Sequence, residues 1–315
     1  MAYVVTGATG HIGNTIVKEL VKENFDVRLL VRKVDESIKD LPVDYRVGNV
    51  FEEKFLASNI NKGDTVIHLA GIIDLKNKLK EETYLINYLG TKLITDICLN
   101  KGVSKLIYFS STDVLKKSDV NEFIKEPTNI NPDYCKTNYS NTKAMATKYL
   151  LELQKKQDKM NIIILYPSAV IGINDFKPSY IGKVVRDVIK NKPQFAIEGG
   201  YNFVDVEDVA RFTVTICRTN ITDSFILSGT QVSVAQLYKA LNKVLNKQKK
   251  IRNLPMWVVK LAIPFVPYLS NYTIETLQDK SKYDCSKAMK YGYSITPFIK
   301  TIEKTIEFHK KYVKK

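Results

Sequence analysis

A glycine-rich turn near the start of the chain constrains the fold more than any other feature of the sequence. A short apolar run is followed by TGATGHIG and then by an amphipathic helical pattern. Gly7 permits a tight turn, Gly10 lets the backbone approach a pyrophosphate, and Gly13 lets the helix pack closely on the strand. The free amides of His11 and Ile12 then face the anion at the helix N-terminus. This context predicts the dinucleotide-binding turn of a Rossmann fold.

Strand and helix patterns alternate through the first half of the chain. Apolar, β-branched runs read as buried parallel strands, and amphipathic stretches lie between several of them. This repetition predicts an α/β fold with a doubly wound parallel sheet. The predicted strands cover residues 3–6, 27–31, 45–47, 65–69, 106–110 and 162–166, and the predicted helices cover 12–22, 84–100 and 141–155.

The pattern changes after Pro167, which predicts two domains. We expect a dinucleotide-binding Rossmann domain over residues 1–165 and a smaller, mostly helical substrate-binding domain over residues 166–315. Parts of 200–225 are expected to return to the first domain. Beyond Pro167, the sequence predicts strands at 203–206 and 225–227 and helices at 234–246 and 299–311.

The chain is strongly basic, with 48 Lys and Arg against 33 Asp and Glu and a net charge of +15. Such a charge suits nucleic acid, an anionic membrane or an anionic substrate. The lysines are scattered and no nucleic-acid-binding motif accompanies them, so we expect solvated faces and no nucleic-acid partner.

The most apolar stretch covers residues 254–269. It is too short to span a bilayer and is interrupted by Lys260, Pro264 and Pro267. We expect a helix that packs over the substrate pocket. The flanking lysines leave open the alternative of a helix that lies on a membrane surface.

The cysteines and histidines indicate neither a metal site nor a disulfide framework. The four cysteines are far apart without a CxxC pair, and the three histidines are not spaced for metal ligation. Free thiols suit a reducing compartment, and no apolar signal core follows a basic start, so we expect a cytoplasmic location.

The end of the second predicted strand indicates which dinucleotide binds. NAD-binding units place an Asp or Glu there to hold the ribose hydroxyls, whereas this strand ends in Val31 followed by Arg32. The guanidinium of Arg32 suits a 2′-phosphate, and Lys39 adds positive charge. NADP(H) is therefore the expected cofactor. The alternative is that Arg32 only stacks on the adenine.

A tyrosine and a lysine four residues apart open the helical pattern after the fifth strand. The spacing puts Tyr139 and Lys143 on one helix face, where an ammonium is expected to lower the pKa of the phenol. Tyr134 lacks such a partner, because Asn138 stands four residues on. At the end of the fifth strand, Ser111 can bind the substrate oxygen, with Thr112 as the fallback.

Several further motifs follow these in an order that resembles a known family. The chain resembles the extended short-chain dehydrogenases/reductases, the NAD-dependent epimerase/dehydratase superfamily, in particular its dihydroflavonol-reductase-like and 3β-hydroxysteroid-dehydrogenase-like branch. The motifs that carry the resemblance are TGATGHIG (6–13), VIHLAG (66–71), NYLGT (87–91), SS (110–111), YSNTK (139–143), YPSAVIG (166–172), VDVEDVA (204–210) and a C-terminal element at 286–297.

Two departures from the family pattern stand out. Asn49 and Val50 occupy positions where many relatives have an Asp and an apolar residue near the adenine. Leu115 and Lys116 replace the Tyr-Gly that is common in nucleotide-sugar enzymes. The second departure shifts the resemblance away from the sugar branch.

The residue patterns and the resemblance together define an expected site. The helix residue Asn87 supports the catalytic centre in the family, and the stretch 166–172 borders the nicotinamide. The expected catalytic residues are Ser111, Tyr139, Lys143 and Asn87. The expected cofactor contacts come from Gly7, Thr9, Gly10, His11, Ile12, Gly13, Arg32, Lys39, Asn49, Val50, Leu69, Ala70, Gly71, Asn87, Ser110, Tyr139, Lys143, Pro167, Ala169 and Val170.

The leading functional hypothesis is an NADP(H)-dependent oxidoreductase that interconverts a carbonyl and an alcohol, with Tyr139 as acid and base. A lid containing Trp257, Phe265 and Tyr268 predicts a small hydrophobic substrate.

Two alternatives belong to other classes. A nucleotide-sugar epimerase or dehydratase would use the same triad and needs basic groups for the diphosphate, for which Arg186, Arg211, Arg218 and Arg252 are candidates. A non-enzymatic dinucleotide sensor or assembly subunit would have kept the fold and lost the chemistry.

A homodimer through the predicted helices 84–100 and 141–155 is a further possibility, because many relatives of the resembled family pair through these helices.

Overall fold

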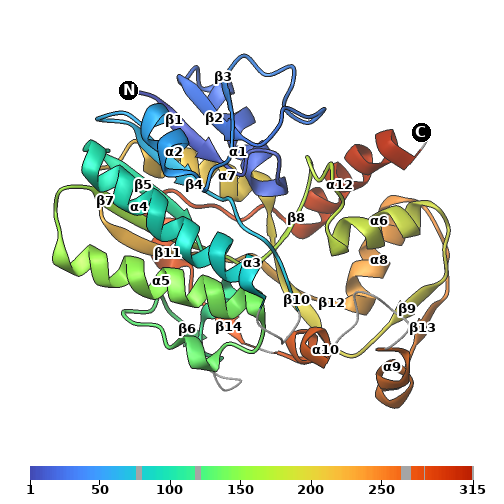
Figure 1. Cartoon of the computed structure of the whole chain (residues 1–315). Coiled ribbons are helices and arrows are strands. Elements are labelled where there is room, and N and C mark those ends of the chain that lie inside the picture. Colours follow the sequence, from blue (N-terminus) through green and yellow to red (C-terminus); the bar gives the residue numbers. More distant parts are fainter. Residues whose placement is uncertain (76–79, 118–121, 264–270, 280, 314–315) are drawn as a thin grey trace.

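A parallel sheet of seven strands forms the centre of the molecule (Figure 1). The computed structural model describes residues 1–75, 80–117, 122–263, 271–279 and 281–313. The strand order is β11-β7-β5-β4-β1-β2-β3, and every neighbouring pair is parallel. The strands are β1 (Tyr3–Thr6), β2 (Val27–Val31), β3 (Asp44–Val47), β4 (Thr65–His68), β5 (Lys105–Phe109), β7 (Asn161–Pro167) and β11 (Asp223–Leu227).

All six strands predicted in the first half of the chain are confirmed, and their ends differ from the predicted ones by at most one residue. The reason is that five of these runs are largely buried on both faces, as in β5, where every residue is buried, whereas β3 at the sheet edge is half-buried or exposed. The chain leaves β1 toward β2 and β3 on one side and continues at β4 and β5 on the other. The carboxyl ends of β1 and β4 therefore form the switch point at which such sheets bind ligands.

Helices cover both faces of the sheet (Figure 1). Apolar side chains of α1 (His11–Lys22) and α7 (Val206–Cys217) pack on one face. Those of α4 (Gly90–Lys101) and α5 (Asn138–Lys156) pack on the other face. A short helix, α2 (Glu53–Asn59), connects β3 and β4. The chain therefore has the doubly wound α/β architecture that the sequence predicts.

The helix predicted over residues 84–100 is confirmed as an unbroken helical run, but it contains a π turn. The chain forms α3 (Glu81–Tyr84), a π-helical turn at Leu85–Leu89 and then α4. A π turn adds a residue to the helical circuit and often marks a functional position. Here the turn contains Asn87, which the sequence had placed in the site.

The C-terminal half builds a second, smaller group of elements (Figure 1). The helices α6 (Tyr180–Ile189), α8 (Val234–Val244) and α12 (Phe298–Val313) share one apolar cluster with a three-stranded sheet. That sheet consists of β8 (Ala169–Ile171), β10 (Gly200–Asp205) and β12 (Thr230–Ser233). The remaining elements are β6 (Phe123–Ile124) with β14 (Lys282–Tyr283), β9 (Gln194–Ala196) with β13 (Ile251–Asn253), α9 (Met256–Ala262), α10 (Asn271–Gln278) and α11 (Ser286–Lys290).

The segment 200–225 is divided between the two groups of elements. The strand β10 lies in the small sheet, whereas α7 packs against α1 on the main sheet. Farther along the chain, β11 pairs with β7 at the edge of the main sheet. The division of the chain into domains at residues 165 and 166 stays a prediction.

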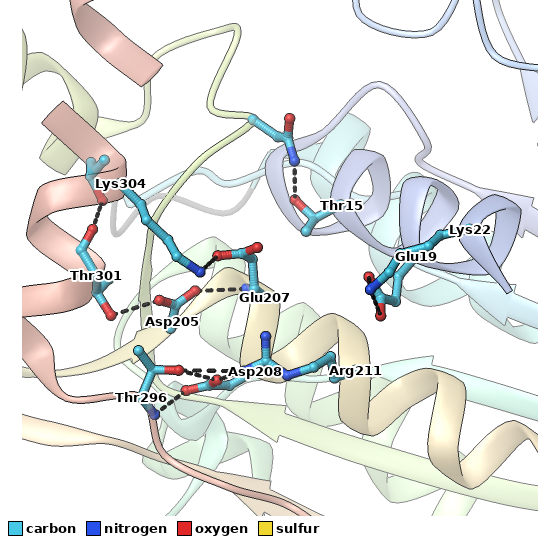
Figure 2. Close-up of polar contacts among 12 residues, drawn as sticks. Thr15, Glu19, Lys22, Asp205, Glu207, Asp208, Arg211, Thr296, Thr301 and Lys304 are labelled. Carbon is cyan, nitrogen blue, oxygen red and sulfur yellow. Dashed lines mark hydrogen bonds and ion pairs between the residues drawn. The ribbon is translucent and has the colours of Figure 1, made fainter. Parts of the chain in front are cut away.

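Acidic residues at the start of α7 attach the C-terminal segment to the main sheet (Figure 2). Asp205 caps α7 by accepting from the Glu207 amide at 2.8 Å and also accepts from the Thr301 hydroxyl at 2.6 Å. Asp208 accepts from the amide and the hydroxyl of Thr296, both at 2.7 Å, and from Arg211. The motif at 204–210 therefore has a structural role in joining α7 to α12.

Within the described ranges, no helix combines the length and the apolar composition that a bilayer crossing requires.

Candidate active site

The glycine turn after β1 has the geometry that its sequence predicts. Gly7 has a φ of +76°, and a Cβ there would lie 2.7 Å from the Ala70 amide nitrogen at the end of β4. A Cβ on Gly13 would lie 2.4 Å from the Gly7 carbonyl oxygen. Gly10 caps α1, which begins at His11 with no acidic residue in its first turn. The helix N-terminus therefore presents amides and no negative charge, as an anion site requires.

Replacing Gly13 with Ala is expected to destabilise the protein by about 1–3 kcal/mol, because the new methyl group would clash with the backbone of the turn. The same change should weaken dinucleotide binding, since α1 must move away from β1. Denaturant unfolding and a cofactor titration would measure both effects. An unchanged free energy of unfolding would contradict the tight packing described for this turn.

The side chain of His11 is occupied by the protein itself. Its Nε2 lies 2.8 Å from the Ile173 carbonyl oxygen, and burial lowers the pKa of His11. This supports the prediction that His11 acts as a spacer at the turn and not as a catalytic base. The neighbouring Ile12 and Thr9 are half-buried beside the same turn.

Positive charge is exposed after β2. Arg32 is exposed, and its guanidinium has no hydrogen-bond or ion-pair partner in the part of the chain that the structure describes. Lys39 is also exposed, but its ammonium pairs with Glu36 at 2.7 Å. The nearby carboxylate of Asp35 pairs with Lys177 at 2.8 Å. Arg32 and the neighbouring Lys33, which is also exposed, are therefore the cations at the end of β2 without a hydrogen-bond or ion-pair partner among the described residues.

The ends of β3 and β4 complete the rim of the switch point. Asn49 is exposed and its side chain accepts from the Phe51 amide at 3.1 Å, while Val50 is buried. After β4, Leu69 and Ala70 are half-buried and Gly71 is exposed. These residues lie in the loops where the sequence placed the cofactor. The Asn49 side chain would have to give up its bond with the Phe51 amide to contact a cofactor.

Asn87 connects three segments of the site. Its Oδ1 accepts from the Ile72 amide at 2.8 Å, and its Nδ2 donates to the Ile72 carbonyl at 2.9 Å. The same nitrogen donates to the Thr142 hydroxyl on α5 at 3.1 Å. Because Asn87 is completely buried in these bonds, it positions the loop after β4 against α5 and is not aimed at a ligand.

Ser111 and Tyr139 meet at the carboxyl end of β5. The Ser111 hydroxyl acts on the Tyr139 phenol and lowers its pKa in part, and the Ser111 Oγ accepts from the Asp113 amide at 3.1 Å. The backbone amide of Tyr139 donates to the Asp74 carbonyl at 3.0 Å. Thr137 caps α5 through a reciprocal pair of bonds with Ser140, which fixes where Tyr139 enters the helix.

The phenol of Tyr139 keeps its proton at neutral pH. Burial raises the pKa of Tyr139 well above its usual value, the negative charge of Asp113 raises it further, and the bond with Ser111 lowers it in part. The sequence had predicted that Lys143 lowers this pKa. The structure differs, because the Lys143 ammonium points to the Phe109 carbonyl, to which it donates at 2.7 Å.

Lys143 is buried with few partners. Its Nζ lies 4.7 Å from the centre of the Tyr108 ring, and burial lowers the pKa of Lys143 to about 7. A Cβ on Gly71 would lie 3.7 Å from this Nζ, so the ammonium adjoins the loop after β4. The group therefore titrates near neutrality and can respond to a ligand that reaches this loop.

The remaining predicted residues form the walls around this centre. The Ser110 hydroxyl is bonded to Thr147 at 2.7 Å, so its side chain is occupied within the protein. Pro167 is buried at the end of β7, and Ala169 and Val170 are half-buried in β8. Tyr134, with 62% of its surface exposed, lies outside this centre.

A cavity of about 160 Å³ opens beside Ser111. Many of its lining residues carry hydroxyl, amide or charged groups, and Lys117 is the cation among the described residues that line it. The other lining residues include Thr112, Asp113, Ser168, Tyr201, Asn202, Gln231, Tyr272, Asp279 and Tyr283. A second cavity shares Asp113, Lys117, Tyr272, Thr276 and Asp279 with the first.

The predicted aromatic lid does not form the described part of this cavity. Trp257 lies on α9 with 67% of its surface exposed and is not among the lining residues. Phe265 and Tyr268 lie outside the described residues, as does 264–269 of the apolar stretch. The described lining therefore contains no residue of the predicted lid, and the hydrophobic substrate stays a prediction. Contact of α9 with a membrane surface stays a prediction.

Comparison with known proteins identifies the family. The model of the NAD dependent epimerase/dehydratase family matches residues 3–225. The chain belongs to this family. The sterol demethylase protein B of Methylococcus capsulatus is 23% identical over 248 residues, which cover 78% of this chain and 74% of that protein. A putative dihydroflavonol 4-reductase of Synechocystis is 25% identical over 263 residues, which cover 81% of this chain and 76% of that protein.

The fold of this chain resembles that of a solved structure over nearly all of its residues. The structure of the UDP-glucose 4-epimerase of Thermotoga maritima with UDP-glucose has a TM-score of 0.82 at 18% identity. It covers 99% of this chain and 100% of the epimerase chain. At this identity the likeness concerns the fold, including the C-terminal elements that the family model does not reach.

Three of the arginines proposed for a diphosphate have partners within this chain. Arg186 donates to His309 at 3.1 Å, Arg211 pairs with Asp208, and Arg218 pairs with Glu23 at 2.7 Å. None of the four candidate arginines is among the described residues that line the cavity beside Ser111. This arrangement weakens the nucleotide-sugar alternative.

Sequence reasoning missed the charged residues of the cavity. Asp113 lies two residues after Ser111 and could have been found from that spacing. Lys117 and Asp279 carry no local signal, because they meet only through the fold, with Nζ and Oδ2 separated by 2.6 Å. The described residues contain no group of three or more His, Cys, Asp or Glu side chains placed to hold a metal.

Proposed function

We propose that this protein is an NADP(H)-dependent oxidoreductase that interconverts a carbonyl and an alcohol. The observation that carries the proposal is Ser111 in the wall of a cavity at the carboxyl end of the parallel sheet, with its hydroxyl acting on the phenol of Tyr139. The residues around the switch point fit a dinucleotide: the turn from Gly7 to Gly13 leaves room for a pyrophosphate, and α1 presents its amides there. When bound, the dinucleotide supplies or removes the hydride at the carbonyl carbon.

The residues of the chain handle the oxygen and the proton. Ser111 donates a hydrogen bond to the substrate oxygen, on which negative charge develops during reduction. Tyr139 donates a proton to the same oxygen, which completes the alcohol. Since burial keeps the pKa of Tyr139 high, the phenol is protonated at neutral pH and ready for reduction. Lys143 adjoins the loop at Gly71, and we propose that its ammonium binds the nicotinamide ribose.

The test is a coupled measurement of cofactor and product. Purified protein is incubated with NADPH and a panel of ketones, aldehydes and nucleotide sugars, and loss of NADPH absorbance is compared with alcohol formation. One alcohol formed for each NADPH consumed supports the proposal. Conversion of a nucleotide sugar without net loss of NADPH would overturn it in favour of an epimerase or dehydratase.

One specific observation favours a second candidate function, a nucleotide-sugar epimerase or dehydratase. The cavity beside Ser111 is lined by hydroxyl and amide groups, which suit a sugar, and the UDP-glucose 4-epimerase of Thermotoga maritima shares the fold. Against it stand the intramolecular partners of Arg186, Arg211 and Arg218. A third candidate, a sensor without chemistry, would bind NADPH and convert no member of the panel.

Replacing Arg32 with Asp is expected to lower the preference for NADPH over NADH by about 10- to 100-fold in kcat/KM. A charge-assisted hydrogen bond to the 2′-phosphate contributes about 1.5–3 kcal/mol, and a carboxylate would repel the phosphate instead. Lys22→Ala, at the far end of α1, is the control. An unchanged preference in Arg32→Asp would mean that Arg32 only stacks on the adenine.

A further inference from the structure

An unpaired carboxylate faces the cavity next to the catalytic pair. Asp113 follows Ser111 by two residues, and its amide is bonded to the Ser111 Oγ at 3.1 Å. Its side chain is half-buried in the cavity wall and has no hydrogen bond or ion pair with any residue that the structure describes. Its charge acts on Tyr139, Tyr201 and Tyr272, and it raises the pKa of each, after burial. Asp113 therefore lies in the cavity wall beside Ser111, without a direct partner among the described residues.

The other charges of the cavity cancel each other. The Lys117 Nζ lies 2.6 Å from Asp279 Oδ2, and the opposite oxygen of Asp279 accepts from the Ser281 amide at 2.9 Å. Two carboxylates thus face one ammonium. The charge of Lys117 acts on both carboxylates, but its ion pair is with Asp279, so one net negative charge remains in the cavity wall and Asp113 carries the carboxylate without a direct partner among the described residues.

We propose that the substrate is a neutral carbonyl compound with a hydroxyl group beside the reacting carbonyl, and that Asp113 accepts the hydrogen bond of this hydroxyl. The inference rests on the proposed function and names the substrate class of the same site. A carboxylate is only an acceptor, so it selects a donor. Its position one short turn from Ser111 puts that donor close to the carbonyl oxygen that Ser111 holds.

The same carboxylate excludes two other classes of carbonyl compound. A hydrocarbon ketone would displace water from Asp113 without replacing its hydrogen bonds, which weakens binding. A keto acid or a phosphorylated ketone would bring a second negative charge next to Asp113, without a free cation among the described lining residues. Specificity therefore arises from both attraction and repulsion at one side chain.

Hydroxyacetone, acetone and pyruvate form a matched test, since they share one carbon skeleton and differ in the group next to the ketone. With the wild-type protein and NADPH, we expect kcat/KM for hydroxyacetone to exceed that for acetone by about 10- to 100-fold. Pyruvate should be the poorest of the three. The ratio of kcat/KM between two of these substrates is not affected by a change in a step that both share, such as hydride or proton transfer.

The variant Asp113→Asn keeps the shape and removes the charge. We expect the ratio of hydroxyacetone to acetone to fall by about tenfold or more and the relative rate with pyruvate to rise. Glu275→Gln is the matched control, because Glu275 lines the neighbouring cavity and is already paired with Lys136 at 2.7 Å. The control should leave all three ratios unchanged.

The outcomes separate this inference from the proposed function. Acetone reduced as well as hydroxyacetone, or ratios that do not change in Asp113→Asn, would overturn the inference and leave the oxidoreductase standing. Failure to reduce these ketones or any carbonyl of the wider panel would overturn both. If Asp113→Asn does not fold, as judged by thermal unfolding, the wild-type order of the three substrates decides the inference.

Discussion

Tyr139→Phe is expected to lower kcat for carbonyl reduction by about 10²- to 10⁴-fold, the range that a positioned general acid contributes. The change removes a single oxygen, on which the Ser111 hydroxyl acts and which carries the proton that we propose the substrate receives. Cofactor affinity should change little, since the aromatic ring remains. Single-turnover rates and an NADPH titration would measure the two quantities separately.

Tyr134→Phe provides the control for that experiment. Tyr134 lies in the short helical turn before α5 and is largely exposed, and Asn138 stands where a lysine would be needed. It should therefore keep wild-type kcat. If Tyr139→Phe also kept wild-type kcat, Tyr139 could not be the proton donor. If the wild type and both variants lacked carbonyl turnover, the sensor alternative would be favoured.

Lys143→Met is expected to change activity and stability in opposite directions. Loss of the ammonium should lower kcat/KM by about 10²-fold or more, because the ribose contact and the charge beside the site disappear. The folded protein should become more stable at pH 6, by an amount on the order of a few kcal/mol. The reason is that Lys143 is only 5% exposed, with Phe109 as its hydrogen-bond partner.

The pH dependence of that gain follows from the pKa of Lys143. Burial lowers it from 10.5 to about 7. Below pH 7 both the folded and unfolded states carry the proton, so the penalty for burying the charge is complete. Between about 7 and 10.5 only the unfolded state keeps the proton, and the free energy of unfolding of the wild type rises with pH. The advantage of Lys143→Met should therefore shrink over this window.

Denaturant unfolding at several pH values would measure this effect, with Lys148→Met as the matched control. Lys148 lies on the same helix and is exposed, so its loss should change neither activity nor the pH profile of stability. An advantage of Lys143→Met that stays constant from pH 6 to pH 10 would contradict the lowered pKa of Lys143.

The sequence by itself determined the sheet, the turn and the pairing of Tyr139 with Lys143 on one helix. These features depend on local patterns: buried apolar runs, glycines where the backbone must turn or pack closely, and a spacing of four on a helix. Each pattern is complete within a few residues. The helix over 84–100 was predicted without its π turn, because the apolar period does not reveal the extra residue around Asn87.

Only the tertiary structure decided the chemical state of the site and the nature of its cavity. Lys143 is directed to Phe109, and burial together with Asp113 keeps the proton on Tyr139, although the Tyr-Lys spacing suggested the opposite. Lys117 and Asp279 lie far apart in the chain and meet across the cavity. Burial and charge are sums over neighbours from many segments, so no local pattern of the sequence contains them.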